Sequence, residues 1–152
     1  MLLISMILFT QALEYPLTRY HVDRRADLSA ASERERLSEA ALEAFFNIMA
    51  KWKVRDVDAR ALLGGVTNGP FYEMKRNPNR VVDEDRLMRI SYLVGIFKAL
   101  HILHGSRLAD QWVQLANQHP IFGGRSPLDY MLGGGLPAMQ TVRRLLDARR
   151  AG

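Results

Sequence analysis

Two histidines, His101 and His104, have the residue type and the spacing that could support chemistry. On a helix, a separation of three places both imidazoles on one face, where they could bind a metal ion together. No third ligand stands at an obvious spacing from them, and both close an apolar run. We therefore interpret them as the last turn of a helix, where a histidine interacts favourably with the helix dipole. The acidic run from Asp83 to Asp85 is interpreted as a solvated first turn.

Other kinds of catalytic or cofactor site are not indicated by the sequence. The chain has no cysteine, which excludes disulfides, thiolate metal sites and a cysteine nucleophile. Its glycine clusters form neither G-x-G-x-x-G nor a phosphate loop. They are each predicted to end a helix, at Gly64-Gly65, Gly123-Gly124 and Gly133-Gly134-Gly135. We expect no catalytic residue, no metal and no cofactor, and a protein that is not an enzyme.

The charge balance indicates an anionic partner. The chain has 21 Lys and Arg residues, 17 of them arginine, against 16 Asp and Glu, for a formal net charge of +5. Arginine forms paired hydrogen bonds with phosphates and carboxylates, so nucleic acid or an acidic pocket on another protein is a plausible partner. The alternative is a genome that favours arginine codons.

The first residues form an apolar segment from Leu2 to Phe9, with no basic residue before it. A membrane-spanning helix needs about 20 apolar residues, and a signal peptide needs a basic start. We therefore expect a cytoplasmic protein with no membrane partner. Residues 1–27 are predicted to be an N-terminal arm that joins the fold or packs on a partner chain.

The fold class predicted for the rest of the chain is all-α, because no segment after residue 28 alternates with a period of two. A helix capped by Ser29 or Ser32 is expected first. One face of that helix should be buried, and consists of Leu37, Ala41, Ala44, Phe45, Ile48 and Trp52. The inward residues of a short second helix should be Val54, Val57, Ala61 and Leu62.

A long helix from Asp83 to about His104 carries apolar residues on two sides. One stripe consists of Leu87, Ile90, Val94 and Phe97, and the other of Leu93, Ile96, Leu100 and Leu103. Because a helix that is apolar on both sides must be covered on both, the second stripe should meet the C-terminal domain or a second copy of the chain. We expect a homodimer.

Three helical segments are predicted beyond Gly105. Ser106 should cap the first, whose inward residues are Leu108, Trp112, Leu115 and Ala116. Ser126 should cap the second, with Pro127 at its first position and Asp129 in its first turn. Pro137 should open the last, with Met139, Val142, Leu145 and Leu146 inward.

Residues 51–89 contain a helix-turn-helix candidate. Arg55 to Leu63 would be its first helix and Asn68 to Arg76 its recognition helix, with a glycine turn between them. The residues expected to meet phosphates or base edges are Thr67, Asn68, Tyr72, Lys75 and Arg76. This stretch has nine bases and six acids, a modest excess. Two helices joined by a glycine turn also occur in any helical bundle.

Several motifs in the C-terminal third resemble the toxin-binding domain of the Xre/MbcA/ParS antitoxin family. They are Trp112, Asn117 and Pro120, Phe122-Gly123-Gly124, Ser126-Pro127-Leu128-Asp129, and a last helix that ends near a terminal Gly152. Upstream, Ala61-Leu62-Leu63-Gly64, Phe71 to Lys75 and Arg89-Ile90-Ser91 resemble the Xre-type helix-turn-helix half of the family. The resemblance covers roughly residues 40 to 152.

The resemblance implies a type II antitoxin with a helix-turn-helix domain at 28–104 and a toxin-binding domain at 105–152. Such a protein neutralises a RES-domain toxin that consumes NAD, and represses its own operon by binding operator DNA. The residues expected to bind the toxin are Ile121, Phe122, Leu128, Met131, Arg143, Arg144, Arg149, Arg150 and Gly152. The apolar members would anchor the toxin, while the arginines have no predicted structural role.

An alternative function stays open, namely a stand-alone helix-turn-helix repressor whose C-terminal half dimerises or senses a small molecule. Ser126, Pro127 and Asp129 are fully explained as a helix cap, and Trp112 is expected in the core. The end of the chain is expected to enter the toxin's active site, with the Gly152 carboxylate in the place of a phosphate.

Overall fold

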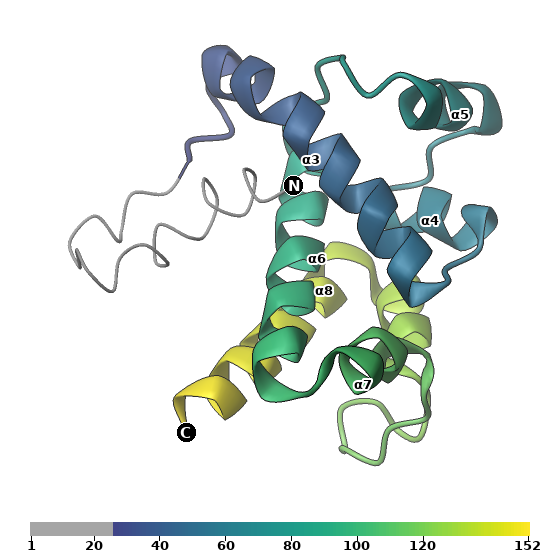
Figure 1. Ribbon diagram of the computed structural model, residues 1–152, viewed down its shortest axis with the longest axis vertical. Helices are drawn as coiled ribbons and strands as arrows, with labels where there is room; N and C mark the ends of the chain where they lie inside the picture. Colours follow the sequence, from purple (N-terminus) through teal and green to yellow (C-terminus); the bar gives the residue numbers. More distant parts are fainter. Residues whose placement is uncertain (1–25) are drawn as a thin grey trace.

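The computed structural model describes residues 26–152, and every regular element in them is helical, as predicted. The elements are α3 (Ala31–Trp52), α4 (Asp56–Leu62), α5 (Asn68–Arg76), α6 (Glu84–Leu103), α7 (Ser106–Gln111), the 3₁₀ helix η3 (Trp112–Gln114) and α8 (Pro127–Ala151). Figure 1 shows α3, α4 and α5 around one end of α6, and α7 and α8 around the other. The predicted N-terminal arm lies almost entirely outside the described residues. Among those residues, no helix is both long enough and apolar enough to span a bilayer.

Helix α3 buries the face predicted from its periodicity, from Leu37 through Phe45 to Trp52. The predicted serine cap is wrong, because Ala30 occupies the N-cap position and no side chain caps the helix. The hydroxyl of Ser29 instead donates to Asp27 Oδ1 at 2.6 Å, and the Ser29 backbone N–H donates to the same oxygen at 3.1 Å. The Asp27 carboxylate is charged and therefore a strong hydrogen-bond acceptor. Ser29 bonds to it within the turn before α3 instead of capping the helix.

Helix α4 presents a different face from the predicted one. Ala59 and Leu62 are buried, whereas Val57 is 53% exposed and Ala61 is exposed. The predicted stripe assumes that the helical repeat begins at Val54. In the structure, however, Lys53 ends α3 in the left-handed region at φ 57°, and Arg55 is extended. Because α4 begins only at Asp56, its helical phase differs from the one assumed.

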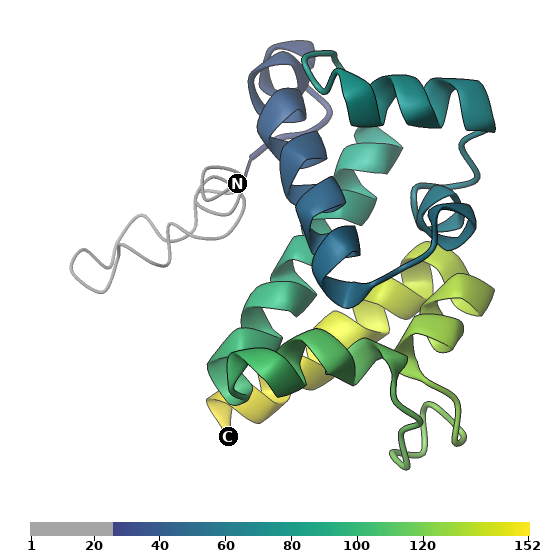
Figure 2. The ribbon, with the colours of Figure 1, turned by 45° about the vertical axis from the view of Figure 1, so that its right-hand side comes forward.

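Helix α6 is central, and its limits agree with the prediction. Asp83 caps it by accepting the Arg86 N–H at 2.9 Å, and His104 follows its last residue. Both predicted stripes are covered within one chain, since α6 packs mainly against α3 and α8 (Figure 2). The C-terminal segment thus covers the stripe that we expected to meet either that segment or a second copy.

The segment after α6 differs from the prediction in its cap and its buried face. Gly105, not Ser106, is the N-cap residue of α7. Leu108 and Leu115 are 43% and 48% exposed, while Ala109, Trp112 and Val113 are buried. The helix ends after six residues and tightens into η3, so the α-helical spacing that predicted Leu115 as inward does not continue past Trp112. Trp112 lies in the core, as expected.

Helix α8 begins and breaks where the sequence indicated. Ser126 Oγ accepts the Asp129 N–H at 3.0 Å, and Pro127 is the first helical residue. The helix breaks at Gly135, whose φ of 64° and ψ of −145° favour glycine. Beyond the break, Met139, Val142 and Leu146 are buried, as predicted. These residues, α3 and α6 belong to one continuous apolar core.

One buried polar side chain links the first helix to the segment that leads into α6. Ser38 is 1% exposed, and its hydroxyl donates to the Arg34 carbonyl at 2.6 Å. The same oxygen accepts the Val82 backbone N–H at 2.9 Å, 44 residues away in the chain. Val82 is itself buried, so the serine satisfies an N–H that water does not reach.

Ser38→Ala should therefore destabilise the protein by about 1–3 kcal/mol, because it leaves the Val82 N–H buried without its acceptor. Urea unfolding followed by circular dichroism measures the change. Ser32→Ala is the matched control, since Ser32 is exposed on the same helix and should change stability by less than about 0.5 kcal/mol. Equal stability of the two variants would contradict the assigned role of Ser38.

Candidate functional site

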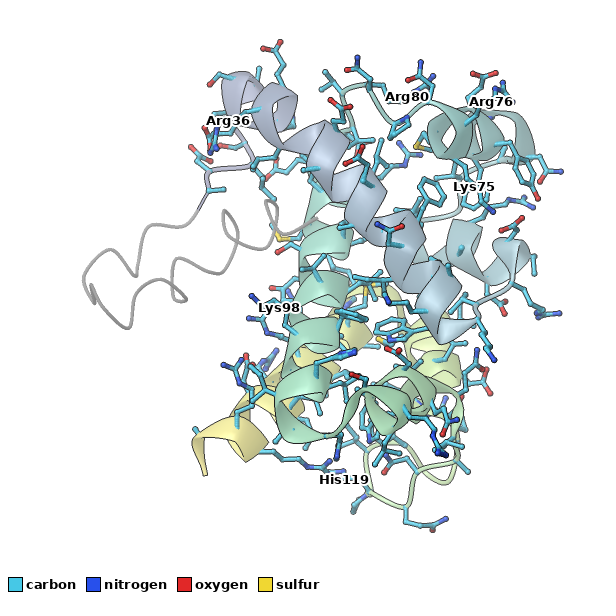
Figure 3. All side chains as sticks on the ribbon, viewed as in Figure 1. Arg36, Lys75, Arg76, Arg80, Lys98 and His119 are labelled. Carbon is cyan, nitrogen blue, oxygen red and sulfur yellow. The ribbon has the colours of Figure 1, made fainter. Side chains whose placement is uncertain are left out.

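The five residues proposed to contact DNA are all exposed on or beside α5, whose limits, Asn68–Arg76, are those predicted. Thr67 occupies the N-cap position, although its side chain makes no capping hydrogen bond. Phe71 and Met74 hold the opposite face of the helix in the core. Figure 3 shows Lys75 and Arg76 on the surface of α5, close to Arg80.

The polar side chains on α5 are engaged by carboxylates of the same chain. The Tyr72 hydroxyl donates to Asp56 Oδ2 at 2.7 Å, and Lys75 Nζ donates to Asp56 Oδ1 at 3.1 Å. Arg76 pairs with Glu73, which also lies 3.7 Å from Arg80. A DNA phosphate would therefore compete with Asp56 and Glu73 for these cations. Asp56, which we did not predict, joins the start of α4 to α5.

The net charge of the protein lies in its C-terminal third. Residues 26–97 contain 11 basic and 11 acidic residues, whereas residues 98–152 contain seven basic and three acidic ones. The excess counted over residues 51–89 is offset by acidic residues of α3 and the turn before it. The excess of basic over acidic residues in the described part of the chain therefore lies in residues 98–152.

Three of the four apolar residues proposed to anchor a toxin lie in the core. Phe122, Leu128 and Met131 are no more than 4% exposed, and Ile121 is half-buried. Phe122 packs edge-to-face on Trp112 and on Tyr130, at centroid distances of 5.9 and 5.3 Å. The two ends of the loop between η3 and α8 are joined by a hydrogen bond from the Asn117 N–H to the Arg125 carbonyl at 3.1 Å. In this conformation these three residues stabilise the domain and present no docking surface.

The proposed arginines differ in their surroundings. Arg143 was expected to have no structural role, but its Nε donates to Asp147 Oδ2 at 3.0 Å and its guanidinium lies against Gly95 of α6. Arg150 Nη1 is 3.5 Å from Asp147 Oδ1. Arg144 and Arg149 are exposed. Helix α8 continues to Ala151, and the Gly152 N–H donates to the Ala148 carbonyl at 3.0 Å, so the residues expected to enter the toxin's active site are helical up to Ala151.

The second half of α6 contributes two surface residues that sequence reasoning missed. Ile102 lines a shallow groove with Arg143, Asp147, Arg150 and Ala151. Lys98 lies one turn earlier on α6 (Figure 3). Burial, followed by the charges of Arg150 and Arg143, lowers its pKa. The available signal for this surface is a single lysine within an apolar helix.

The histidines behave as the end of a helix. His101 Nδ1 lies 3.0 Å from the Phe97 carbonyl oxygen, and its Nε2 lies 3.2 Å from Asp110 Oδ1. Both ring nitrogens thus have partners in the protein. Among residues 26–152 there is no group of three or more His, Asp or Glu side chains that could hold a metal ion.

Comparisons with known proteins identify a domain family in the last third of the chain. Residues 98–152 match the family described as the antitoxin Xre/MbcA/ParS C-terminal toxin-binding domain. An uncharacterized protein of Sinorhizobium fredii (strain NBRC 101917 / NGR234), y4oB, is 37% identical over 114 residues, which span 74% of this chain and 86% of that protein. No solved structure matches the chain significantly.

The contacts of Asp56 predict how its carboxyl group titrates. The hydrogen bond from Tyr72, and next that from Lys75, favours the charged form and lowers the Asp56 pKa. In NMR titration of the carboxyl carbon, Tyr72→Phe should raise the Asp56 pKa more than Lys75→Met does. Because the folded-state pKa is depressed, the stability that Asp56 contributes is present above its unfolded pKa and is lost as pH falls through the folded value. An Asp56 pKa that neither variant changes would contradict these contacts.

Proposed function

Because this chain belongs to the Xre/MbcA/ParS antitoxin family, we propose that it neutralises a RES-domain toxin that consumes NAD, and that it represses its own operon. A toxin partner follows from the domain at residues 98–152. The RES identity of that toxin is supported by the resemblance of Trp112, Phe122-Gly123-Gly124 and Ser126 to Asp129 to antitoxins of this kind. The family role is regulatory rather than enzymatic.

The observation that carries the proposal is the coincidence of charge and domain. The segment that matches the toxin-binding family also holds the excess positive charge, seven basic residues against three acidic ones. Exposed charge of one sign attracts an oppositely charged partner and speeds association with it. An antitoxin whose target has an acidic surface would have this distribution.

The end of α8 is suited to blocking a nucleotide pocket. An enzyme that binds NAD must accommodate its diphosphate, so its pocket presents polar groups that a blocking segment must satisfy. Arg149 and Arg150 are exposed on the last turn of α8 and would pair with acids at the rim of that pocket. Ile121 is the one proposed apolar anchor that has accessible surface, so polar and charged contacts supply more of the interaction than the sequence suggested.

Deleting residues 149–152 should weaken inhibition of the toxin by at least about tenfold, because it removes the two rim arginines and the last turn of α8. The buried face of α8 stays intact, so the truncated chain should still fold and still bind the toxin. NAD consumption by the co-purified toxin measures inhibition, and sedimentation measures binding. Arg36→Gln, at the far end of the molecule in Figure 3, is the control. Full inhibition by the truncated chain would mean that the domain body blocks the enzyme.

DNA binding is proposed to use α5, and self-association would let two copies read paired half-sites. The apolar stripes of α6 do not require a dimer, because α3 and α8 cover them within one chain. The proposed homodimer therefore rests on the geometry of operator recognition alone. A stand-alone repressor would bind DNA in the same way but would co-purify with no toxin.

Replacing Lys75 and Arg76 by alanine should lower affinity for the chain's own upstream DNA. The dependence of log affinity on log salt concentration should become shallower by about 1 to 2, since each phosphate contact contributes about 0.9. Fluorescence anisotropy at two or more salt concentrations measures both quantities. Arg36→Ala should leave them unchanged. An unaltered salt slope in the double variant would remove α5 from the DNA contact.

A further inference from the structure

One carboxylate links the two helices of the helix-turn-helix unit. Asp56 is the first residue of α4, and it accepts hydrogen bonds from two side chains of α5, the Tyr72 hydroxyl at 2.7 Å and Lys75 Nζ at 3.1 Å. Lys75 Nζ also lies 6.0 Å from the centre of the Tyr72 ring. Figure 3 shows Lys75 on the side of α5 that faces α4. These three residues form one polar cluster, which we call the Asp56 cluster.

The Asp56 cluster lies at the surface, so its ion pair contributes little to stability. The side chains of Lys75 and Asp56 are 46% and 40% exposed, and Tyr72 is 42% exposed. Ion pairs with this exposure add little to the free energy of unfolding. An acidic residue in the first turn of α4 interacts favourably with the helix dipole, but Asp58 lies in that turn as well. The contacts with α5 are therefore what distinguishes Asp56 from Asp58.

A carboxylate on this face affects phosphates and base edges differently. The hydrogen bond from Tyr72, and next that from Lys75, lowers the Asp56 pKa, so the group is ionised at neutral pH. Its charge repels DNA phosphates and competes with them for Lys75. The Lys75 ammonium keeps two further N–H donors, and the Tyr72 oxygen can still accept. Base edges are uncharged and offer acceptors such as O6 and N7 of guanine, so the cluster disfavours phosphates more than bases.

Asp56 also limits where Lys75 can reach. A lysine has a flexible four-carbon stem, so an unpaired ammonium can turn to whichever phosphate is nearest. The contacts with Asp56 and with the Tyr72 ring instead hold Lys75 Nζ on the side of α5 toward α4. A polar group that its neighbours hold in one position distinguishes between partners better than a mobile one.

We propose that Asp56 is a specificity-determining residue of the α5 DNA surface, where it directs Lys75 and Tyr72 to base edges and opposes their transfer to phosphates. This inference rests on the proposed DNA-binding function. Asp56 acts through the two α5 side chains, so it is a positioning residue. Specificity is a difference between two affinities, and a carboxylate that weakens binding to DNA in general increases that difference.

The first experiment compares Asp56→Asn with Asp58→Asn in the full chain. Asp58 pairs with Arg55 at 3.2 Å, so each variant removes one negative charge from α4 and releases one cation. Only Asp56→Asn releases a cation on α5. Fluorescence anisotropy measures the affinity of each variant for the chain's own upstream DNA and for a duplex of scrambled sequence, at several salt concentrations.

Asp56→Asn should bind the scrambled duplex about three- to tenfold more tightly than the wild-type chain does, because Lys75 gains a phosphate contact. The slope of log affinity against log salt concentration should become steeper by about 0.9. Affinity for the upstream DNA should not rise, so the ratio of the two affinities should fall by about the same factor. Asp58→Asn should leave that ratio unchanged.

The second experiment is a double-mutant cycle between Asp56 and Lys75. In the Lys75→Met background, Asp56→Asn should change affinity for the scrambled duplex no more than Asp58→Asn does, because no ammonium remains to be released. Thermal unfolding followed by circular dichroism shows that each variant is folded.

The outcomes separate the role of Asp56 from the function on which it depends. If the wild-type chain prefers its upstream DNA and Asp56→Asn prefers it equally, the proposal is wrong and DNA binding by α5 stands. Equal loss of preference in Asp58→Asn would mean that net charge sets specificity, and weaker binding of Asp56→Asn to both duplexes would mean a structural role. Either result overturns the proposal. If the wild-type chain binds neither duplex, or binds both equally, operator recognition and the role of Asp56 are both wrong.

Discussion

Burial of α6 on both sides is the constraint on which the rest of the structure depends. Its apolar residues point in nearly every direction, so the helix is stable in water only when α3 and α8 cover it. The positions of the neighbouring elements follow from this packing. Gln114 holds η3 to the end of α3 through the Trp52 carbonyl at 3.0 Å, and Ser38 holds the start of α6 to α3 through Val82. The elements that carry the α5 surface and the end of α8 are thus held by the same core.

The sequence predicted the long elements well and the short ones poorly. The 22 residues of α3 and the 20 of α6 contain several turns, so their apolar periods identify the buried face without an exact starting point. Helices α4 and α7 have seven and six residues, and a shift of one position moves a different residue inward. The left-handed backbone of Lys53 sets where α4 begins, and α7 is cut short where the chain tightens into η3 at Trp112. Neither has a clear sequence signature.

The candidate sites show the same division between local and long-range information. The outward residues of α5 were predictable because they depend only on helical spacing. Their pairing with Asp56 was not, since 16 and 19 residues separate the partners. The apolar motif residues of the C-terminal third are predicted to contact the toxin, but a motif does not distinguish Phe122, which lies in the core, from Ile121, which lies at its edge. The groove beside Ile102 also escaped prediction, because its residues come together only after α8 packs on α6.

The shared core has a consequence for how this protein would be removed from a cell. Helix α6 carries residues of both halves, and a single apolar cluster runs from Leu28 to Leu146. Elements that share a core lose their structure together, so local opening of one half exposes the packing of the other. A protease that acts on the unfolded chain would therefore abolish the α5 surface and the α8 surface in one event. Under the proposed function, the toxin and the operator would then be released together, with no separate signal needed to couple them.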